Sequence, residues 1–289
     1  MQLKPIGPAV IIALLLVTSA NASPSAPGEP AEPTPSTSAT DTGIAPQPNW
    51  VLVWGDEFNQ DGFLDPAKWS KCERGTSDWD RHMTTNSACF EVKAGCLILR
   101  GINNTNAADP VKVITGGITS RGKFDFTYGK VQIRAKLGCA QGAWPAFWML
   151  PAKAGWPDGG EIDIMEHLNF DDIVYQTVHS HYTLKLGEKK NPPHSGKAPH
   201  NPGQFNLYGV EWYPDKLVFT INDKPTFTYP RIQTDKQGQW PFVKPFYLLL
   251  DMQLGGSWVR AIDYAQLPVQ MELDWVRVFQ DKAKAAEPK

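Results

Sequence analysis

The chain has 289 residues and a formal net charge of −2, and 11% of its residues are aromatic. A nearly neutral chain exerts no general electrostatic attraction on nucleic acid or anionic membranes, so the composition argues against both as partners. The 11 Trp residues are many for a chain of this size. Core filling is the stronger explanation for any single Trp, but sugar rings stack on indole faces, so the excess weakly favours a carbohydrate-binding protein.

The N-terminal 48 residues divide into two segments that precede the expected domain. Residues 1–22 carry a positive charge near the start, then the apolar run AVIIALLLV, then a small-x-small site. This pattern is typical of a secretory signal peptide cleaved after Ala22, with an uncleaved anchor as the alternative. Residues 23–48 contain seven Pro among Ser, Thr, Ala and Glu, which predicts an extended, mobile linker. We therefore expect an exported protein, extracellular or periplasmic, with no membrane span.

Residues 49–281 are expected to form one domain built almost entirely from strands, followed by a short charged tail at 282–289. Apolar and β-branched segments alternate with turns rich in Gly, Pro, Asn and Asp. Helical periodicity is weak throughout, and only 259–267 suggests a helical turn. Many short strands at regular spacing predict an all-β fold of two large antiparallel sheets, packed as a sandwich or closed as a barrel. The predicted strands are 51–58, 96–102, 123–137, 146–150, 161–167, 173–181, 205–213, 216–224, 246–254 and 271–280.

Four cysteines, Cys72, Cys89, Cys96 and Cys139, are an even set in a chain expected to be exported. Disulfides are therefore chemically available, and three pairings are possible. The chain contains no C-x-x-C motif, which is the spacing that would suggest a zinc site. Reduced, buried thiols are the alternative, because Cys96 begins an apolar strand.

Residues 160–167, with the sequence GEIDIMEH, hold three carboxylates within six positions. Glu161 and Asp163 alternate with isoleucines, so both acids lie on one face of a strand. Strict alternation would turn Glu166 into the core, where an unpaired carboxylate is costly. A one-residue bulge at 164–165 resets the alternation and returns Glu166 to the face of the other two acids.

Three acids on one strand face suit more than one kind of chemistry. Hydrolysis of a glycosidic bond needs two carboxyl groups, one protonated and one ionised. With one residue taken up by the bulge, Glu161 and Glu166 are four strand positions apart, and such positions lie about 13 Å from each other. A bulge and leaning side chains bring Glu161 and Glu166 toward the separation of about 5 to 5.5 Å that retaining glycosidases use. Asp163 between them can orient Glu161, and its charge can hold the proton on Glu166. A solvated acidic face and a Ca²⁺ site are the alternatives.

The same stretch resembles the E-[IL]-D-[IV]-x-E signature of family 16 of the glycoside hydrolases. The extra residue before the last Glu is similar to the laminarinase-like, endo-β-1,3-glucanase branch. Further segments match the family in its own order, and together they span about 50 to 280. These segments are 54–58, 128–130, 142–151, 209–215 and 273–279.

This resemblance implies a β-jelly-roll sandwich of two antiparallel sheets with a concave substrate cleft. It also implies retaining endo-hydrolysis of a β-linked polysaccharide, with β-1,3- or mixed β-1,3/1,4-glucan as the expected substrate. Carried over by position, Glu161 is the nucleophile, Glu166 the general acid/base and Asp163 the helper.

The resemblance also implies substrate-binding residues. Trp144 and Trp148 match cleft tryptophans of the family, Trp258 matches another, and His179 matches a histidine on the strand after the acids. As alternatives, Trp148 would fill the core and His179 would be a buried structural histidine.

Asp274 matches a structural calcium ligand of the family, and Glu57 or a nearby backbone carbonyl would complete that site. No cofactor is implied for catalysis. We expect a monomer whose partner is the polysaccharide substrate.

The chain departs from the family pattern at three places. Gln132 stands where many members have Glu, and Asp251 stands where Asn is common. Residues 183–204 form a polar insertion with several Lys and His, which would suit an anionic glycan such as carrageenan or would simply be solvated. The competing functions are a transglycosylase, an agarase- or carrageenase-type hydrolase, and a non-catalytic glycan-binding protein. The last usually lacks one of the two glutamates, and both are present here.

Overall fold

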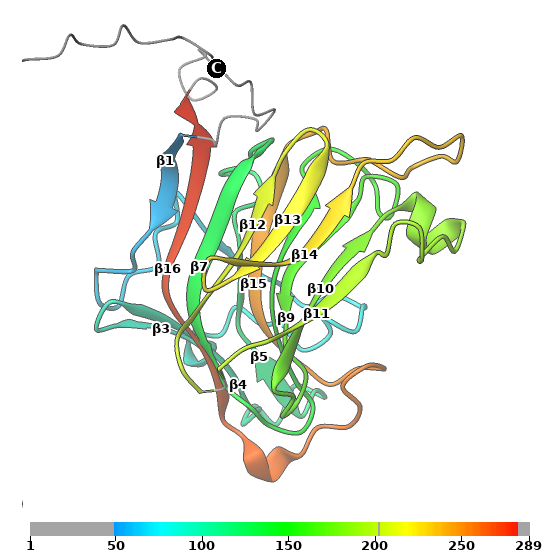
Figure 1. The fold of residues 1–289 in the computed structure, drawn as a ribbon. Coiled ribbons are helices and arrows are strands. Elements are labelled where there is room, and N and C mark those ends of the chain that lie inside the picture. The colour runs from blue at the N-terminus through cyan, green and yellow to red at the C-terminus, as the bar shows by residue number, and fades with distance from the viewer. Residues whose placement is uncertain (1–48, 202, 283–289) are drawn as a thin grey trace, which may run out of the picture. The chain divides into compact units, whose positions relative to one another are not determined.

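The computed structural model describes residues 49–201 and 203–282, and these form two antiparallel sheets packed face to face (Figure 1). This is the all-β jelly-roll sandwich that the sequence predicts. The expected signal peptide (1–22), the linker (23–48) and the tail beyond residue 282 lie outside the described residues. Among the described residues, no helix has the length and apolarity needed to cross a membrane.

One sheet of the described part has nine strands, in the order β14-β13-β12-β7-β16-β4-β3, with β1 beside β16 and β5 beside β4. The strands are β1 (Trp50–Asp56), β3 (Phe90–Lys93), β4 (Cys96–Asn103), β5 (Val113–Thr115), β7 (Gly129–Leu137), β12 (Asn206–Trp212), β13 (Lys216–Ile221), β14 (Lys224–Pro230) and β16 (Val269–Asp281).

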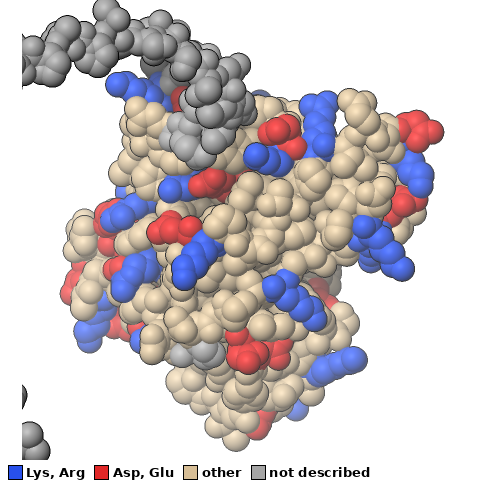
Figure 2. Space-filling view, in the orientation of Figure 1, with Lys and Arg blue, Asp and Glu red and all other residues tan. Residues whose placement is uncertain are grey.

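Figure 2 shows that Lys and Arg are interspersed with Asp and Glu on the face of the molecule seen in this view, so that face carries no field of one sign.

The other sheet has seven strands in the described part, in the order β11-β10-β9-β8-β15-β6-β2. These are β2 (Ser70–Lys71), β6 (Gly117–Thr119), β8 (Ala143–Pro151), β9 (Glu161–Glu166), β10 (Ile173–His179), β11 (Ser195–Pro199) and β15 (Phe246–Leu254). Three short helical turns are described, η1 (Ser87–Cys89), η2 (His181–Lys185) and η3 (Tyr264–Gln266), and η3 confirms the helical turn expected near the C-terminus.

Each predicted strand overlaps an observed one, but two segments differ from their prediction. The strand expected over 123–137 begins only at Gly129, because Tyr128 and Gly129 have positive φ values of 58° and 137° and turn the chain. A Cβ at Gly129 would lie 2.3 Å from the carbonyl oxygen of Phe279, so a side chain does not fit there. Within the polar insertion at 183–204, Ser195–Pro199 pairs with β10 as an edge strand. Its polar, Pro- and Gly-containing sequence is typical of an edge, which explains why it reads as a loop.

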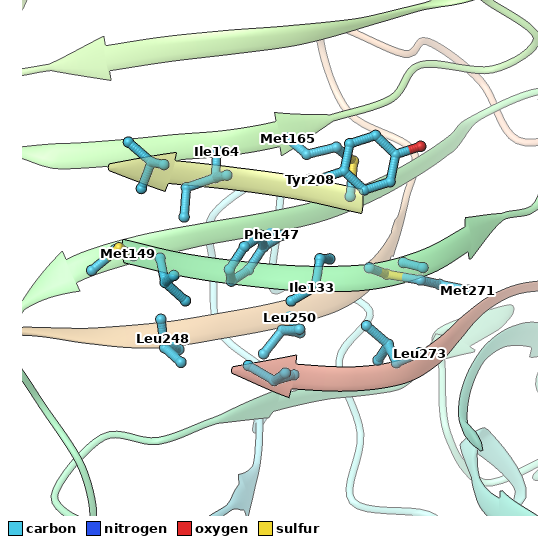
Figure 3. Close-up of a cluster of buried hydrophobic side chains, with 14 of the residues drawn as sticks. Ile133, Phe147, Met149, Ile164, Met165, Tyr208, Leu248, Leu250, Met271 and Leu273 are labelled. Carbon is cyan, nitrogen blue, oxygen red and sulfur yellow. The ribbon is translucent and has the colours of Figure 1, made fainter. Parts of the chain in front are cut away.

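Strand β9 contains the predicted bulge. Asp163 and Glu166 pair with residues only two apart on β10, so Ile164 and Met165 together oppose Gln176. Both side chains are fully buried, and Figure 3 shows them in the apolar layer between the sheets. The bulge is therefore confirmed, and the acids on either side of it share the outer face of the sheet.

The core between the sheets determines what faces outward on β15. Leu248 and Leu250 lie in the same buried cluster as Ile133 and Leu273 of the opposite sheet (Figure 3). Burying each such side chain stabilises the fold by about 1.5 to 3 kcal/mol. Because side chains alternate along a strand, the odd-numbered residues of β15, including Asp251, point to the opposite face of the seven-stranded sheet.

All four cysteines are described, and all four are free thiols in the structure. Cys72 and Cys89 are buried, and burial raises the pKa of the Cys89 thiol to about 11. The structure therefore matches the alternative of reduced, buried thiols for Cys72 and Cys89, whereas Cys96 is partly exposed and Cys139 is exposed.

Candidate active site

A cleft of about 360 Å³ lies on the outer face of the seven-stranded sheet, over β9, β8 and β15. The bulge of β9 brings all three predicted carboxylates to this cleft. Its lining residues are Ser77, Trp79, Trp144, Ala146, Trp148, Leu150, Trp156, Glu161, Asp163, Glu166 and Gln253.

Glu166 is 8% exposed and lies beside Ala146 of β8. The indole Nε1 of Trp144 donates a hydrogen bond of 2.9 Å to its Oε1. Burial raises the pKa of Glu166 to about 8, and the negative charges of Glu161 and Asp251 act in the same direction. Glu166 is thus protonated at neutral pH, as a general acid must be.

Glu161 is half-buried at the start of β9 and accepts a hydrogen bond from the indole Nε1 of Trp156. Burial raises its pKa, whereas the hydrogen bonds from Asp163 and Trp156 lower it. These donors favour the ionised form, which is the form that can act as a nucleophile.

Asp163 lies between the two glutamates and is 3% exposed. Burial, together with the charges of Glu161 and Glu166, raises its pKa well above the usual range. In this state Asp163 is a protonated donor to Glu161. This differs from the sequence expectation of a charged Asp163, because strand alternation does not reveal how completely the group is desolvated. One negative charge shared among three carboxyl groups is the arrangement that a buried site tolerates best.

His179 of β10 has its Nε2 3.4 Å from Oδ2 of Asp163. Burial lowers the pKa of His179 to about 4, so the imidazole is neutral. The structure thus places His179 against the helper carboxyl group, and His179 is not among the residues that line the cleft.

Tryptophans form the walls of the cleft. Trp144 and Trp148 stand on either side of the small Ala146 on β8, and Trp148 is 6% exposed beneath Trp79. Trp258 is 42% exposed and packs edge-on against Trp144, with ring centroids 5.6 Å apart. Trp144 and Trp148 therefore line the cleft, and Trp258 extends the aromatic surface past Trp144.

Six of the lining residues were not predicted, and three of them, Trp79, Trp156 and Gln253, have large or polar side chains suited to holding a sugar. The sequence held a signal for Trp156, because it lies in the Gly- and Pro-rich segment 154–160. In the structure Trp156 is 61% exposed. A large aromatic between strand ends cannot fill a core and is a candidate for binding. Trp79 lies in a similar polar segment. Gln253 offers no comparable signal.

The predicted calcium ligands are engaged by arginines. Asp274 accepts a hydrogen bond of 2.5 Å from Arg134, and Glu57 accepts two of 2.8 Å from Arg277. These carboxylates are already neutralised, so as they stand they do not fit a calcium cage.

All three acids reach the cleft, but the group with the spacing of metal ligands consists of Glu161, Asp163 and His179, without Glu166. The ligand atoms of Glu161, Asp163 and His179 all lie within 4.8 Å of one another. A neutral imidazole beside two carboxyl groups is not the all-oxygen set that Ca²⁺ prefers.

Comparisons with known proteins agree with this geometry. The model of the family described as "Glycosyl hydrolases family 16" matches residues 81–277. The keratan-sulfate endo-1,4-beta-galactosidase of Sphingobacterium multivorum is 41% identical over 235 residues, which are 80% of this chain and 55% of that protein. The beta-glucanase of Rhodothermus marinus is 34% identical over 80% of this chain and 86% of that protein.

Among solved structures, the laminarinase from Rhodothermus marinus superposes with a TM-score of 0.73 at 32% identity, over 81% of this chain and 98% of that one. The chain thus spans nearly all of the glucanase, but only a little over half of the galactosidase.

Proposed function

Because the chain belongs to family 16 of the glycosyl hydrolases, we propose that it is a retaining endo-hydrolase of a β-linked glycan. The observation that carries this proposal is the bulge of β9, which brings Glu161 and Glu166 to one cleft with Asp163 between them. Glu161 accepts a hydrogen bond from Trp156, and burial raises the pKa of Glu166 to about 8, so Glu166 holds its proton at neutral pH on the same face. Both lie in a cleft walled by Trp, which suits a sugar chain.

The double displacement follows from these protonation states. The carboxylate of Glu161 attacks the anomeric carbon, and the glycosidic C–O bond breaks as Glu166 gives its proton to the leaving oxygen. Glu166 then takes a proton from water, whose oxygen attacks the same carbon and releases Glu161. The site carries one negative charge throughout, first on Glu161 and then on Glu166. Asp163 supplies the hydrogen bond that Glu161 needs each time it is an anion.

The first substrate proposal is β-1,3- or mixed-linkage β-glucan. It is supported by the similarity to the beta-glucanase and the laminarinase of Rhodothermus marinus. Transfer of the glycosyl group to another sugar instead of water would use the same residues. Chain lengths of the products, measured by mass spectrometry, distinguish hydrolysis from transfer.

A sulfated or otherwise anionic glycan is the second candidate. A cavity of about 330 Å³ adjoins the cleft and shares Leu150 and Trp156 with it. Arg121 and Lys153 line this cavity, and no carboxylate does. Neither cation has an ion-pair partner in the part of the chain that the structure describes. This feature, together with the 41% identity to a keratan-sulfate endo-1,4-beta-galactosidase, favours an anionic chain.

The test is a digestion of laminarin, lichenan and keratan sulfate, with products separated by chromatography. We expect oligosaccharides from one of them, and no turnover by Glu161→Gln with its fold and glycan affinity retained. Turnover by Glu161→Gln at the wild-type rate would contradict the proposed nucleophile. Glycan binding without any turnover by the wild type would instead support a non-catalytic binding protein.

We also propose that the protein is exported after cleavage behind Ala22 and acts as a monomer. The support for export is the pattern of residues 1–22. N-terminal sequencing of protein recovered outside the cytoplasm tests the cleavage site, and light scattering tests the monomer.

A calcium ion at Asp274 would require its carboxylate to leave Arg134. We therefore expect the unfolding temperature to be the same in calcium and in EDTA. If calcium instead raised the unfolding temperature, and Asp274→Asn abolished that increase, Asp274 would be a calcium ligand as the family resemblance implies.

A further inference from the structure

Gln253 lines the cleft from β15, yet nothing in the catalytic mechanism uses it. It is 2% exposed and pairs across the sheet with Trp144, whose indole holds Glu166. Its Oε1 is buried and has no hydrogen-bond partner among the described residues. A buried acceptor without a partner is costly, so its presence at a binding surface needs an explanation.

The orientation of the Gln253 amide is set by Asp251. Nε2 of Gln253 donates a hydrogen bond of 2.7 Å to Oδ1 of Asp251, and Nε1 of Trp148 donates one of 3.0 Å to Oδ2. An indole only donates, so Oδ2 of Asp251 accepts from Trp148. Burial raises the pKa of Asp251 to about 7, and above that pH its carboxyl group is ionised and only accepts hydrogen bonds. The nitrogen of the Gln253 amide must therefore face Asp251, which leaves the oxygen without a partner in the protein.

Asp251 is itself held rigidly. It is fully buried on the cleft side of β15, and Gly117 of β6 packs on it so closely that a Cβ there would lie 2.7 Å from the Asp251 Cβ. The hydrogen bond from Trp148 to Oδ2 then keeps Oδ1 directed at the Gln253 amide. The Oε1 acceptor is thus preorganised before any ligand arrives, which reduces the entropy that binding must overcome.

We propose that Gln253 selects substrate by accepting a hydrogen bond from a sugar hydroxyl or acetamido N–H bound beside Glu166, and that Asp251 is the positioning residue that fixes its amide. The proposal rests on the proposed glycosidase function. It adds a polar specificity contact to a cleft that is otherwise walled by indole rings. Sugars that present no donor at this point would bind less well, because Oε1 would stay unsatisfied.

The first test replaces Gln253 with Met, which keeps the length of the side chain and removes both polar atoms. We expect KM on the cleaved glycan to rise about tenfold with kcat nearly unchanged, because a neutral hydrogen bond to the bound sugar is lost in ground state and transition state alike. The matched control is Gln60→Met, at an exposed position after β1, which should leave KM unchanged. An unchanged KM in Gln253→Met would overturn the proposal.

The second test asks whether Asp251 acts through Gln253. In Asp251→Asn, the amide oxygen takes the place of the Asp251 Oδ2 that accepts from Trp148, and the amide nitrogen takes the place of Oδ1, so it faces Gln253 and turns the Gln253 amide over. We expect Asp251→Asn to raise KM by a similar factor in the wild type and to have no further effect in the Gln253→Met background. Additive effects in the double variant would contradict the positioning role.

Binding measured in the Glu161→Gln background separates this proposal from the function. Calorimetry with laminarin and keratan sulfate oligosaccharides should give about tenfold weaker binding for Glu161→Gln/Gln253→Met than for Glu161→Gln. That result would stand even if the wild type cleaves none of the glycans. Equal affinities would overturn the role of Gln253 whether or not the protein is an enzyme.

Discussion

At the scale of single residues, the central feature is the separation of the two glutamate protonation states. Burial raises the pKa of both groups, but hydrogen bonds from Asp163 and Trp156 oppose this at Glu161, whereas the pKa of Glu166 reaches about 8. For Glu166 the protonated form is active. As the pH rises through the pKa of this group the general acid is lost, so kcat/KM should fall above about pH 8.

Replacing Trp144 with Phe tests the origin of that pKa. The indole donates to Glu166 and lowers its pKa, against the larger effect of burial. Removing the donor should move the alkaline limb of the kcat/KM profile to higher pH, in addition to any loss of sugar affinity. A limb that stays in place, or moves to lower pH, would contradict the assignment of Glu166 as the group that titrates.

At the scale of elements, the bulge of β9 couples the catalytic face to the core. Met165 is fully buried between the sheets because the bulge turns it and Ile164 inward together. Met165→Ala should therefore lower the free energy of unfolding by about 2 to 5 kcal/mol, measured by denaturant titration. Leu52→Ala on β1, where Leu52 is 52% exposed, is the control and should change it by no more than about 0.5 kcal/mol. Equal effects for the two variants would mean that Met165 does not fill the core.

How much of the site can be predicted from sequence depends on which element carries the residue. The acids and the bulge of β9 follow from alternation and from the cost of burying Glu166, and both are local properties. Gln253 could not be found in this way, because its importance depends on Asp251 being covered by Gly117, which is distant in sequence. Trp156 could have been found from its turn-rich surroundings.

The same reasoning explains two of the strands that were missed. β5 and β6 have three residues each, too few for a period to be detected, and they are recognisable only through their partners in the sheets. The extent of β10 and β15 was predicted well because their apolar residues continue through a fully paired strand. The free cysteines show a similar limit, since an even count says nothing about how far apart the thiols lie.

At the scale of the whole molecule, the near-neutral charge gives no general attraction for an anionic polymer, and the face in Figure 2 carries both signs. Any preference for a sulfated chain must therefore come from local cations, and Arg121 and Lys153 at the end of the cleft are the candidates. Arg121→Gln/Lys153→Gln should lower kcat/KM on keratan sulfate about fivefold and leave the value on chemically desulfated keratan unchanged. An equal loss of kcat/KM on both substrates would mean that Arg121 and Lys153 do not bind the sulfate groups.

The most direct measurement of the central claim is the anomeric configuration of the first product, followed by proton NMR during cleavage of whichever glycan the protein hydrolyses. Attack by Glu161 followed by attack of water inverts the anomeric carbon twice, so we expect the β-anomer to appear first and to equilibrate only later by mutarotation. An α-anomer as the first product would mean a single displacement by water, and would contradict Glu161 as the nucleophile.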